Sequence, residues 1–220
     1  MPLFLLHAAD GFFSVPVSLV FWAITIAALA ISLKRAGERL DERAIPLMGV
    51  MAAFIFAGQM FNFQIPGGTS GHLLGGVLAG ILLGPYAGTV VMACVIAVQA
   101  LVFQDGGLVV LGANIFNMGI IGTMGGYWVY RAIAGALGGE EKGRLPAAAV
   151  AAWLSVVAAA VVVSIQLALS DTTSLGAALV AMVGWHVLIG IGEAIITVGA
   201  LAFIRVARAD LLTLREASAA

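Results

Sequence analysis

The chain has 220 residues, of which 62% are hydrophobic and only 10% are charged, with a formal net charge of -1. Its apolar runs approach or exceed the ~18–20 residues that a helix needs to cross a bilayer. The composition therefore predicts a polytopic α-helical membrane protein without a separate soluble domain. The single cysteine, Cys94, lies within an apolar run, which excludes a disulfide framework and a zinc site built on thiolates.

Prolines and glycines mark the boundaries of the predicted helices in chain order. Pro16 suits the opening turn of the first helix, and Pro46 and Pro146 open the second and the sixth. Gly84-Pro85 separates the third helix from the fourth. The predicted ranges are 14–34, 45–62, 71–83, 86–104, 112–136, 146–169 and 177–207. The third range is short for a hydrocarbon core of ~30 Å, so taken alone it could be re-entrant.

The basic residues decide how many times the chain crosses the membrane. With seven crossings and the N-terminus outside, all ten fall on the cytoplasmic side, as the positive-inside rule expects. A re-entrant third helix would leave basic residues outside, among them Arg131, Lys142 and Arg144. We therefore predict an all-α, seven-helix bundle, N-terminus outside and C-terminus inside. It forms a single membrane domain over residues 1–220, with a cytoplasmic tail at 208–220. The ten are Lys34, Arg35, Arg39, Arg43, Arg131, Lys142, Arg144, Arg205, Arg208 and Arg215.

A glycine-rich stretch at 66–76 interrupts the apolar runs on the predicted outer side and contains His72. Irregular polar backbone beside membrane spans is tolerated only where protein or a water-filled cavity covers it, so this stretch predicts a small-ligand site. Ser70 is a plausible N-cap, which would place His72 in the first helical turn. The helix dipole there favours the neutral, metal-binding ring. Alternatively, His72 only hydrogen-bonds the glycine loop.

His7 and Asp10 precede the first helix, in an extracytoplasmic segment over residues 1–13 that we predict to belong to the site. The Asp10-Gly11 pair is typical of a turn, which would fold His7 back over the outer face of the bundle. Two imidazoles from separate segments suit nickel, copper, cobalt or zinc better than magnesium or calcium. The alternative is that His7 is an ordinary residue at the membrane interface.

His186 and Glu193 are seven residues apart and therefore lie on nearly the same face of the last helix. We interpret Glu193 as a residue that holds packed helices together, bonded to an asparagine or glutamine across the bundle. The available partners are Asn114, Asn117, Gln59, Gln99 and Gln166. For His186, a supporting role at the metal site and a packing role both remain open. Asp10, His186, Asn114 and Asn117 are thus possible additional groups at the site.

Several segments resemble, in this order, the CbiM/NikM family, the substrate-binding membrane subunits of energy-coupling-factor transporters for cobalt and nickel ions. The matching segments are 7–14, 53–57, 59–63, 66–76, 105–108, 112–118 and 186–194. The resemblance implies a seven-helix fold. It also implies a metal held by the N-terminal amine, by the main-chain nitrogen and ring of the next residue, a histidine, and by a loop histidine. The two histidines map onto His7 and His72.

The first residue of the family pattern does not map, because six residues precede His7. A cleaved leader, or a start at Leu6 read from a non-standard start codon, would restore the chelate. We therefore expect the working protein to begin at residue 6, which makes Leu6 a further candidate at the site. The family pattern also often has proline before the aspartate, where this chain has Ala9.

The resulting functional prediction is a multi-pass protein of a prokaryotic inner membrane that captures Co(II) or Ni(II) for an ATP-driven importer. The chain has no phosphate-binding loop, so ATP must be hydrolysed by partners. The resemblance implies a membrane coupling subunit (T component), two ATPase subunits and often a small extra membrane subunit. We expect no catalytic residue, no cofactor and no nucleic acid. The alternatives are an ion-coupled carrier or channel with Glu193 as proton relay, and an intramembrane metalloenzyme using His72 and Glu193.

Overall fold

The computed structural model describes residues 7–40, 44–60, 62–65 and 69–212, and these are mainly helical, as the composition predicted. The elements are α1 (Val15–Arg39), α2 (Ala44–Gln59), β1 (Asn62–Ile65), β2 (Thr69–His72), α3 (Gly76–Leu83), α4 (Pro85–Val102), α5 (Leu111–Ile115), the π-helix η1 (Phe116–Gly125), α6 (Gly126–Ala136), α7 (Glu140–Leu169) and α8 (Leu175–Ala207). Because α5, η1 and α6 follow one another without a break, they correspond to the single helix predicted at 112–136.

Four helices, α1, α4, α7 and α8, are long and apolar enough to cross a membrane. Three of them, α4, α7 and α8, contact α3, as do η1 and α6, and every residue of α3 is buried. Close packing around α3 depends on glycine: a Cβ on Gly126 would lie 2.6 Å from a methyl carbon of Val77. The short helix is therefore a core element of the bundle, and the strand before it leads directly into the centre of the protein.

A β-hairpin replaces the predicted loop between the second and third helices, so the expectation of a purely helical chain is wrong here. β1 and β2 pair antiparallel, with Asn62 opposite His72. α2 ends at Gln59, and α3 begins only at Gly76, after Gly75 with a left-handed φ of 72°. The strand signal in this segment is limited to the four alternating residues of β1, Asn-Phe-Gln-Ile, beside the predicted end of a helix at residue 62. β2 reads Thr-Ser-Gly-His, without alternating apolar residues.

The predicted start of the sixth helix at Pro146 is also wrong. α7 begins at Glu140, and Pro146 lies inside it. Two acidic residues in the first turn favour a helix N-terminus, and Arg144 pairs with Glu140 one turn earlier at 3.3 Å. These interactions extend the helix ahead of the proline, which removes only one main-chain hydrogen bond near its start.

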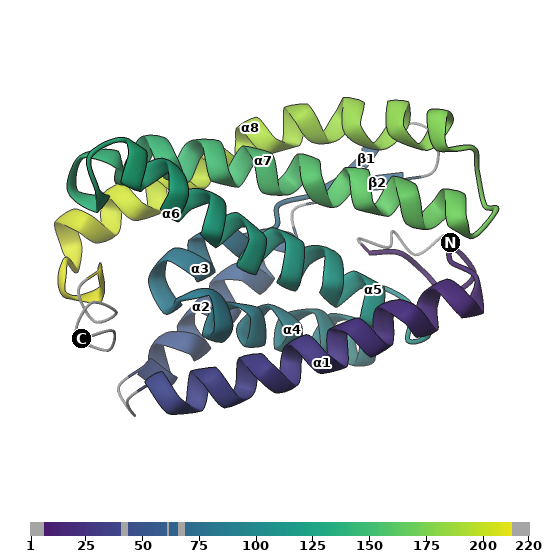
Figure 1. The fold of residues 1–220 in the computed structure, drawn as a ribbon, viewed down its shortest axis with the longest axis horizontal. Helices are drawn as coiled ribbons and strands as arrows, with labels where there is room; N and C mark the ends of the chain where they lie inside the picture. Colours follow the sequence, from purple (N-terminus) through teal and green to yellow (C-terminus); the bar gives the residue numbers. More distant parts are fainter. Residues whose placement is uncertain (1–6, 41–43, 61, 66–68, 213–220) are drawn as a thin grey trace.

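Figure 1 shows how the ends of the elements are distributed. Residues 7–14, before α1, and the turn between α7 and α8 lie at one end of the molecule, on the right of the view. The end of α1, the turn between α6 and α7 and the end of α8 lie at the other. α7 and α8 run side by side, and β2 contacts α8. The hairpin thus reaches from the core toward the end that carries the N-terminal segment.

Candidate metal site

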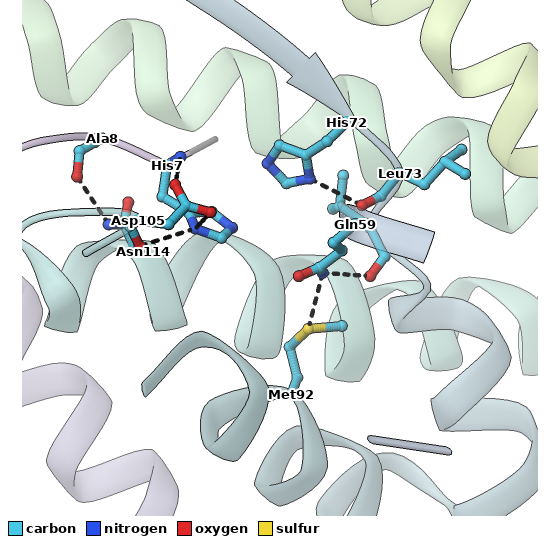
Figure 2. A network of polar contacts seen from close by, with 9 residues as sticks. His7, Ala8, Gln59, His72, Leu73, Met92, Asp105 and Asn114 are labelled. Atoms are coloured by element: carbon cyan, nitrogen blue, oxygen red, sulfur yellow. Dashed lines mark hydrogen bonds and ion pairs between the residues drawn. The ribbon is translucent and has the colours of Figure 1, made fainter. Parts of the chain in front are cut away.

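The structure brings His7 and His72 together from segments far apart in the sequence. Their ring centroids are 4.8 Å apart and their planes make an angle of 79°, an edge-to-face arrangement. Both residues are buried, with 7% and 8% of their surface exposed. Figure 2 shows His7 arriving from the segment before α1 and His72 from the end of β2. Two imidazoles therefore converge inside the protein, as the proposed metal site requires.

The hydrogen bonds of the two rings indicate which nitrogen is available for a metal. His72 Nδ1 lies 2.9 Å from the carbonyl oxygen of Leu73, and His7 Nδ1 lies 3.4 Å from that of Asp105. A carbonyl oxygen only accepts, so Nδ1 carries the proton in both rings and Nε2 keeps its lone pair. His7 Nε2 is buried and has no hydrogen-bond partner within the described residues. Such a tautomer, fixed through the other ring nitrogen, is typical of histidine metal ligands.

Burial keeps both rings neutral. It lowers the pKa of His7 to about 4, against a smaller opposing effect of the hydrogen bond to Asp105. Burial, and then charge repulsion from His7, lowers the pKa of His72 to about 3. The sequence-based reason for a neutral His72, a helix dipole, is wrong because His72 lies on a strand. The conclusion that the ring is neutral holds for a different physical reason, desolvation.

Asp10 holds the N-terminal segment against the loop before α5. Its carboxylate accepts hydrogen bonds from three successive main-chain N–H groups, those of residues 108, 109 and 110, at 3.1, 2.8 and 3.3 Å. Gly11 follows with a φ of 94°, the turn that the Asp-Gly pair predicted. The Asp10 oxygens are therefore directed at this loop, and the residue anchors the His7 segment.

Asp105 and Gly107 fasten the same segment from the other side. Asp105 is buried, and its Oδ1 accepts from the main-chain nitrogen of His7 at 3.3 Å, while its Oδ2 lies 3.5 Å from His7 Nδ1. Gly107 N donates to the Ala8 carbonyl at 2.9 Å, and Asn114 Nδ2 donates to the same oxygen at 3.0 Å. Asn114 thus supports the segment from the end of the bundle.

Asp105 is the residue at the site that sequence reasoning missed. The run Asp105-Gly106-Gly107 was visible as an acid followed by two small residues, and that was the available signal. Its function depends on a contact with a residue 98 positions earlier in the chain. A Cβ on Gly107 would overlap the Asp10 carboxylate, which explains why this loop needs glycine at that position.

The other candidate residues have different positions. Asn117 forms a reciprocal pair with Gln166 of α7, with distances of 2.8 and 3.0 Å, so its amide joins two helices. His186 Nδ1 donates to the carbonyl of Met182 at 2.6 Å, and the ring is near enough to His72 to lower the pKa of His72 by charge repulsion. Leu6 lies outside the described residues. Within the described ranges, no group of three or more histidine, cysteine, aspartate or glutamate side chains has metal-site geometry.

Within the described residues, Glu193 bonds main-chain groups and not an asparagine or glutamine side chain, so that interpretation is wrong. Its two carboxyl oxygens accept from the main-chain nitrogens of Leu74 and Gly75, at 2.9 and 2.7 Å. The hairpin ends against α8, where its N–H groups have no strand or helix partner, and a buried backbone donor needs an acceptor. Glu193 supplies that acceptor for Leu74 and Gly75, which follow His72 by two and three residues.

The apolar spans define a membrane protein, and the paired neutral imidazoles have the donor atoms that late transition metals prefer. Comparison with known families assigns the chain more narrowly. Residues 7–211 match the CbiM family model, described as the cobalt uptake substrate-specific transmembrane region, and the chain belongs to this family.

Named relatives and a solved structure agree with this assignment. The chain is 42% identical over 215 residues to a protein of Archaeoglobus fulgidus named "Putative fused nickel transport protein NikMN", covering 96% of this chain and 70% of that one. It is 30% identical over 223 residues to the cobalt transport protein CbiM of Sorangium cellulosum, covering 94% of each. A crystal structure of a truncated transition metal transporter has a TM-score of 0.84 at 31% identity, covering 90% of this chain and 97% of that one. These relatives are named as transporters, not enzymes.

Proposed function

We propose that this chain captures Co(II) or Ni(II) on the outer side of a prokaryotic cell membrane, as the substrate-specific subunit of an energy-coupling-factor importer. The observation that carries the proposal is the convergence of the buried, neutral rings of His7 and His72, whose centroids lie 4.8 Å apart. The names of the relatives support cobalt and nickel as the transported ions. The metal is the cargo of the protein, and both ions accept the same nitrogen donors.

The proposed topology has seven crossings: α1, α2, α3, α4, the continuous run α5–η1–α6, α7 and α8. Lys34 and Arg35 lie near the end of α1, Arg131 and Lys142 flank the turn between α6 and α7, and Arg205 lies near the end of α8. The end of α1, the turn between α6 and α7 and the end of α8 all lie on the left of Figure 1, opposite the segment that carries His7. The positive-inside rule then puts the histidine pair toward the outer side.

We further propose that the main-chain nitrogen of His7 joins the two rings as a ligand when the metal binds. The main-chain nitrogen and the ring of one histidine reach the same metal only through Nδ1, so the His7 ring exchanges its Nδ1 contacts with Asp105 for the metal. Its main-chain N–H donates to Asp105 Oδ1 at 3.3 Å, a hydrogen bond that ends when the nitrogen loses its proton to bind the metal. The negative charge of the Asp105 carboxylate then compensates part of the charge of the divalent cation in a buried site. The amine of residue 6 completes the set in a chain that begins there. His186 lies near His72, and its imidazole would be the next nitrogen donor for the metal if the amine of residue 6 were missing.

The pH dependence of metal affinity tests the amide ligand. The pKa values of about 4 for His7 and about 3 for His72 keep both rings deprotonated well below neutral pH. Protons therefore do not compete with the metal for either ring between about pH 7.5 and 5.5. An amide nitrogen, in contrast, must lose its proton when the metal binds. We expect the metal affinity to fall at least about tenfold for each unit by which the pH is lowered over this range. Calorimetric titration at several pH values measures this, and a flat profile would show that the amide is not a ligand.

Uptake should depend on partner subunits. The proposed assembly contains a membrane coupling subunit, a pair of ATPases and a small extra membrane subunit, and the fused names of some relatives support association with further components. We expect cells that express this chain alone to accumulate little radioactive nickel or cobalt, and cells that also express the ATPases and the coupling subunit to concentrate it. Strong accumulation without any coupling ATPase would instead identify an ion-coupled carrier.

A further inference from the structure

We propose that Glu193 and Gln59 are positioning residues that form a two-sided clamp on the peptide after His72 and thereby fix the direction of the metal-binding ring. The inference rests on the proposed function, since it assigns a purpose to two buried polar residues next to the proposed ligand. Neither residue touches the space between the two histidine rings as a metal ligand would. Both act through the main chain of Leu74 and Gly75.

The clamp contacts Leu74 on both of its main-chain polar groups. Glu193 of α8 accepts from Leu74 N at 2.9 Å, and Gln59 of α2 donates through Nε2 to Leu74 O at 2.9 Å. Glu193 also accepts from Gly75 N at 2.7 Å. Figure 2 shows the Gln59 amide between the hairpin and Met92, whose sulfur lies 3.6 Å from Gln59 Nε2. One side chain from each of two helices, α2 and α8, thus holds this turn in place.

The clamp reaches His72 through a single residue. The carbonyl of Leu73, between His72 and Leu74, accepts from His72 Nδ1 at 2.9 Å and so sets the tautomer and the orientation of the ring. A rotation of the peptide at Leu73 or Leu74 would move this acceptor and turn the lone pair of Nε2 away from His7. Outer partners that orient a histidine ligand in this way are known to control metal affinity.

Burial makes the clamp expensive to disturb. Glu193 is 2% exposed and Gln59 is 1% exposed, and a polar group that loses its partner is costly where it is buried. Both residues line a cavity of about 170 Å³, together with residues 73–75, Thr197 and apolar side chains of α2, α3 and α8. This space allows a substituted side chain at position 193 to fit without steric conflict, which isolates the effect of the hydrogen bonds.

The test compares Glu193→Gln with Thr197→Val in the full chain. Glutamine keeps the size of the side chain but offers one acceptor oxygen, and its NH₂ group would face an N–H donor. Thr197 lies one turn further along α8, lines the same cavity and is buried, so its replacement changes the cavity without touching the clamp. We expect Glu193→Gln to lower nickel affinity by about 10–100-fold and to shift the ligand-field absorption of bound nickel, whereas Thr197→Val should change neither.

Hydrogen–deuterium exchange of the peptide that contains residues 73–76 gives a readout independent of metal. We expect faster exchange of the Leu74 and Gly75 amides in Glu193→Gln without metal, and a wild-type rate in Thr197→Val. Gln59→Leu removes the other side of the clamp; it should also weaken nickel binding, and it replaces Glu193→Gln if that variant does not fold. Wild-type affinity, spectrum and exchange in Glu193→Gln would overturn the clamp. Failure of the wild-type chain itself to bind nickel would overturn the proposed function, while the exchange rates would still decide the clamp.

Discussion

Replacing His72 with alanine should abolish high-affinity binding of cobalt and nickel while leaving membrane insertion and helical content unchanged. His72 is the only histidine on the hairpin, and its buried ring lies edge-to-face with that of His7, with the ring centroids 4.8 Å apart. Loss of an outer partner of a metal ligand already costs 10–100-fold in affinity, so the loss of the ligand itself should cost more than about 100-fold. Competition of the purified protein with a metal-binding dye measures this loss.

A suitable control for this prediction is Cys94→Ala. Cys94 is exposed on α4 and carries the single thiol of the chain, a soft donor that could bind a transition metal. Its replacement should leave affinity unchanged, which excludes binding through the thiol. Equal affinity of His72→Ala and the wild-type protein would remove the metal site from the hairpin.

Gly107→Ala should weaken metal binding almost as strongly, although Gly107 has no donor atom for a metal. A Cβ at this position would overlap the carboxylate and the main chain of Asp10, and backbone atoms cannot move aside as a flexible side chain can. Asp10 would lose its three N–H partners and the His7 segment would shift. We expect at least a tenfold loss of nickel affinity and about 1–3 kcal/mol of destabilisation, the usual cost of overpacking.

Gly49→Ala is the matched control for Gly107→Ala. Gly49 lies in α2, and a Cβ there would meet nothing within 4 Å. Its replacement should leave affinity unchanged and favour the helix slightly. A Gly107→Ala variant that binds nickel like the wild-type protein would show that the N-terminal segment is not held by the loop before α5.

The sequence predicted the helical elements because their apolar runs are long and bounded by proline or glycine. It also predicted that His7 and His72 would meet, since the Asp10-Gly11 turn reverses the chain toward the glycine-rich stretch. The hairpin escaped prediction because Thr69–His72 has no apolar alternation and is ordered by contacts with β1 and α8. Local propensity carries no information about such tertiary contacts.

The polar partners were the least predictable part of the site. Glu193 bonds a backbone segment 118 and 119 residues away, and Asp105 bonds a backbone nitrogen 98 residues away. Backbone donors are present at every position, so no residue type marks them in a sequence. An acid in an apolar helix therefore indicated a buried polar contact, but only the fold identified its partner.

X-ray absorption at the nickel edge tests the central claim, that His7 and His72 both bind the metal, most directly. The sample is the nickel-loaded full chain, its first residue established by intact mass, beside His7→Ala and His72→Ala. We predict the outer-shell scattering of two imidazoles in the wild-type protein and of one imidazole in any nickel retained by either variant. Scattering from two imidazoles that persists in both variants, or its absence from the wild-type protein, would contradict the account.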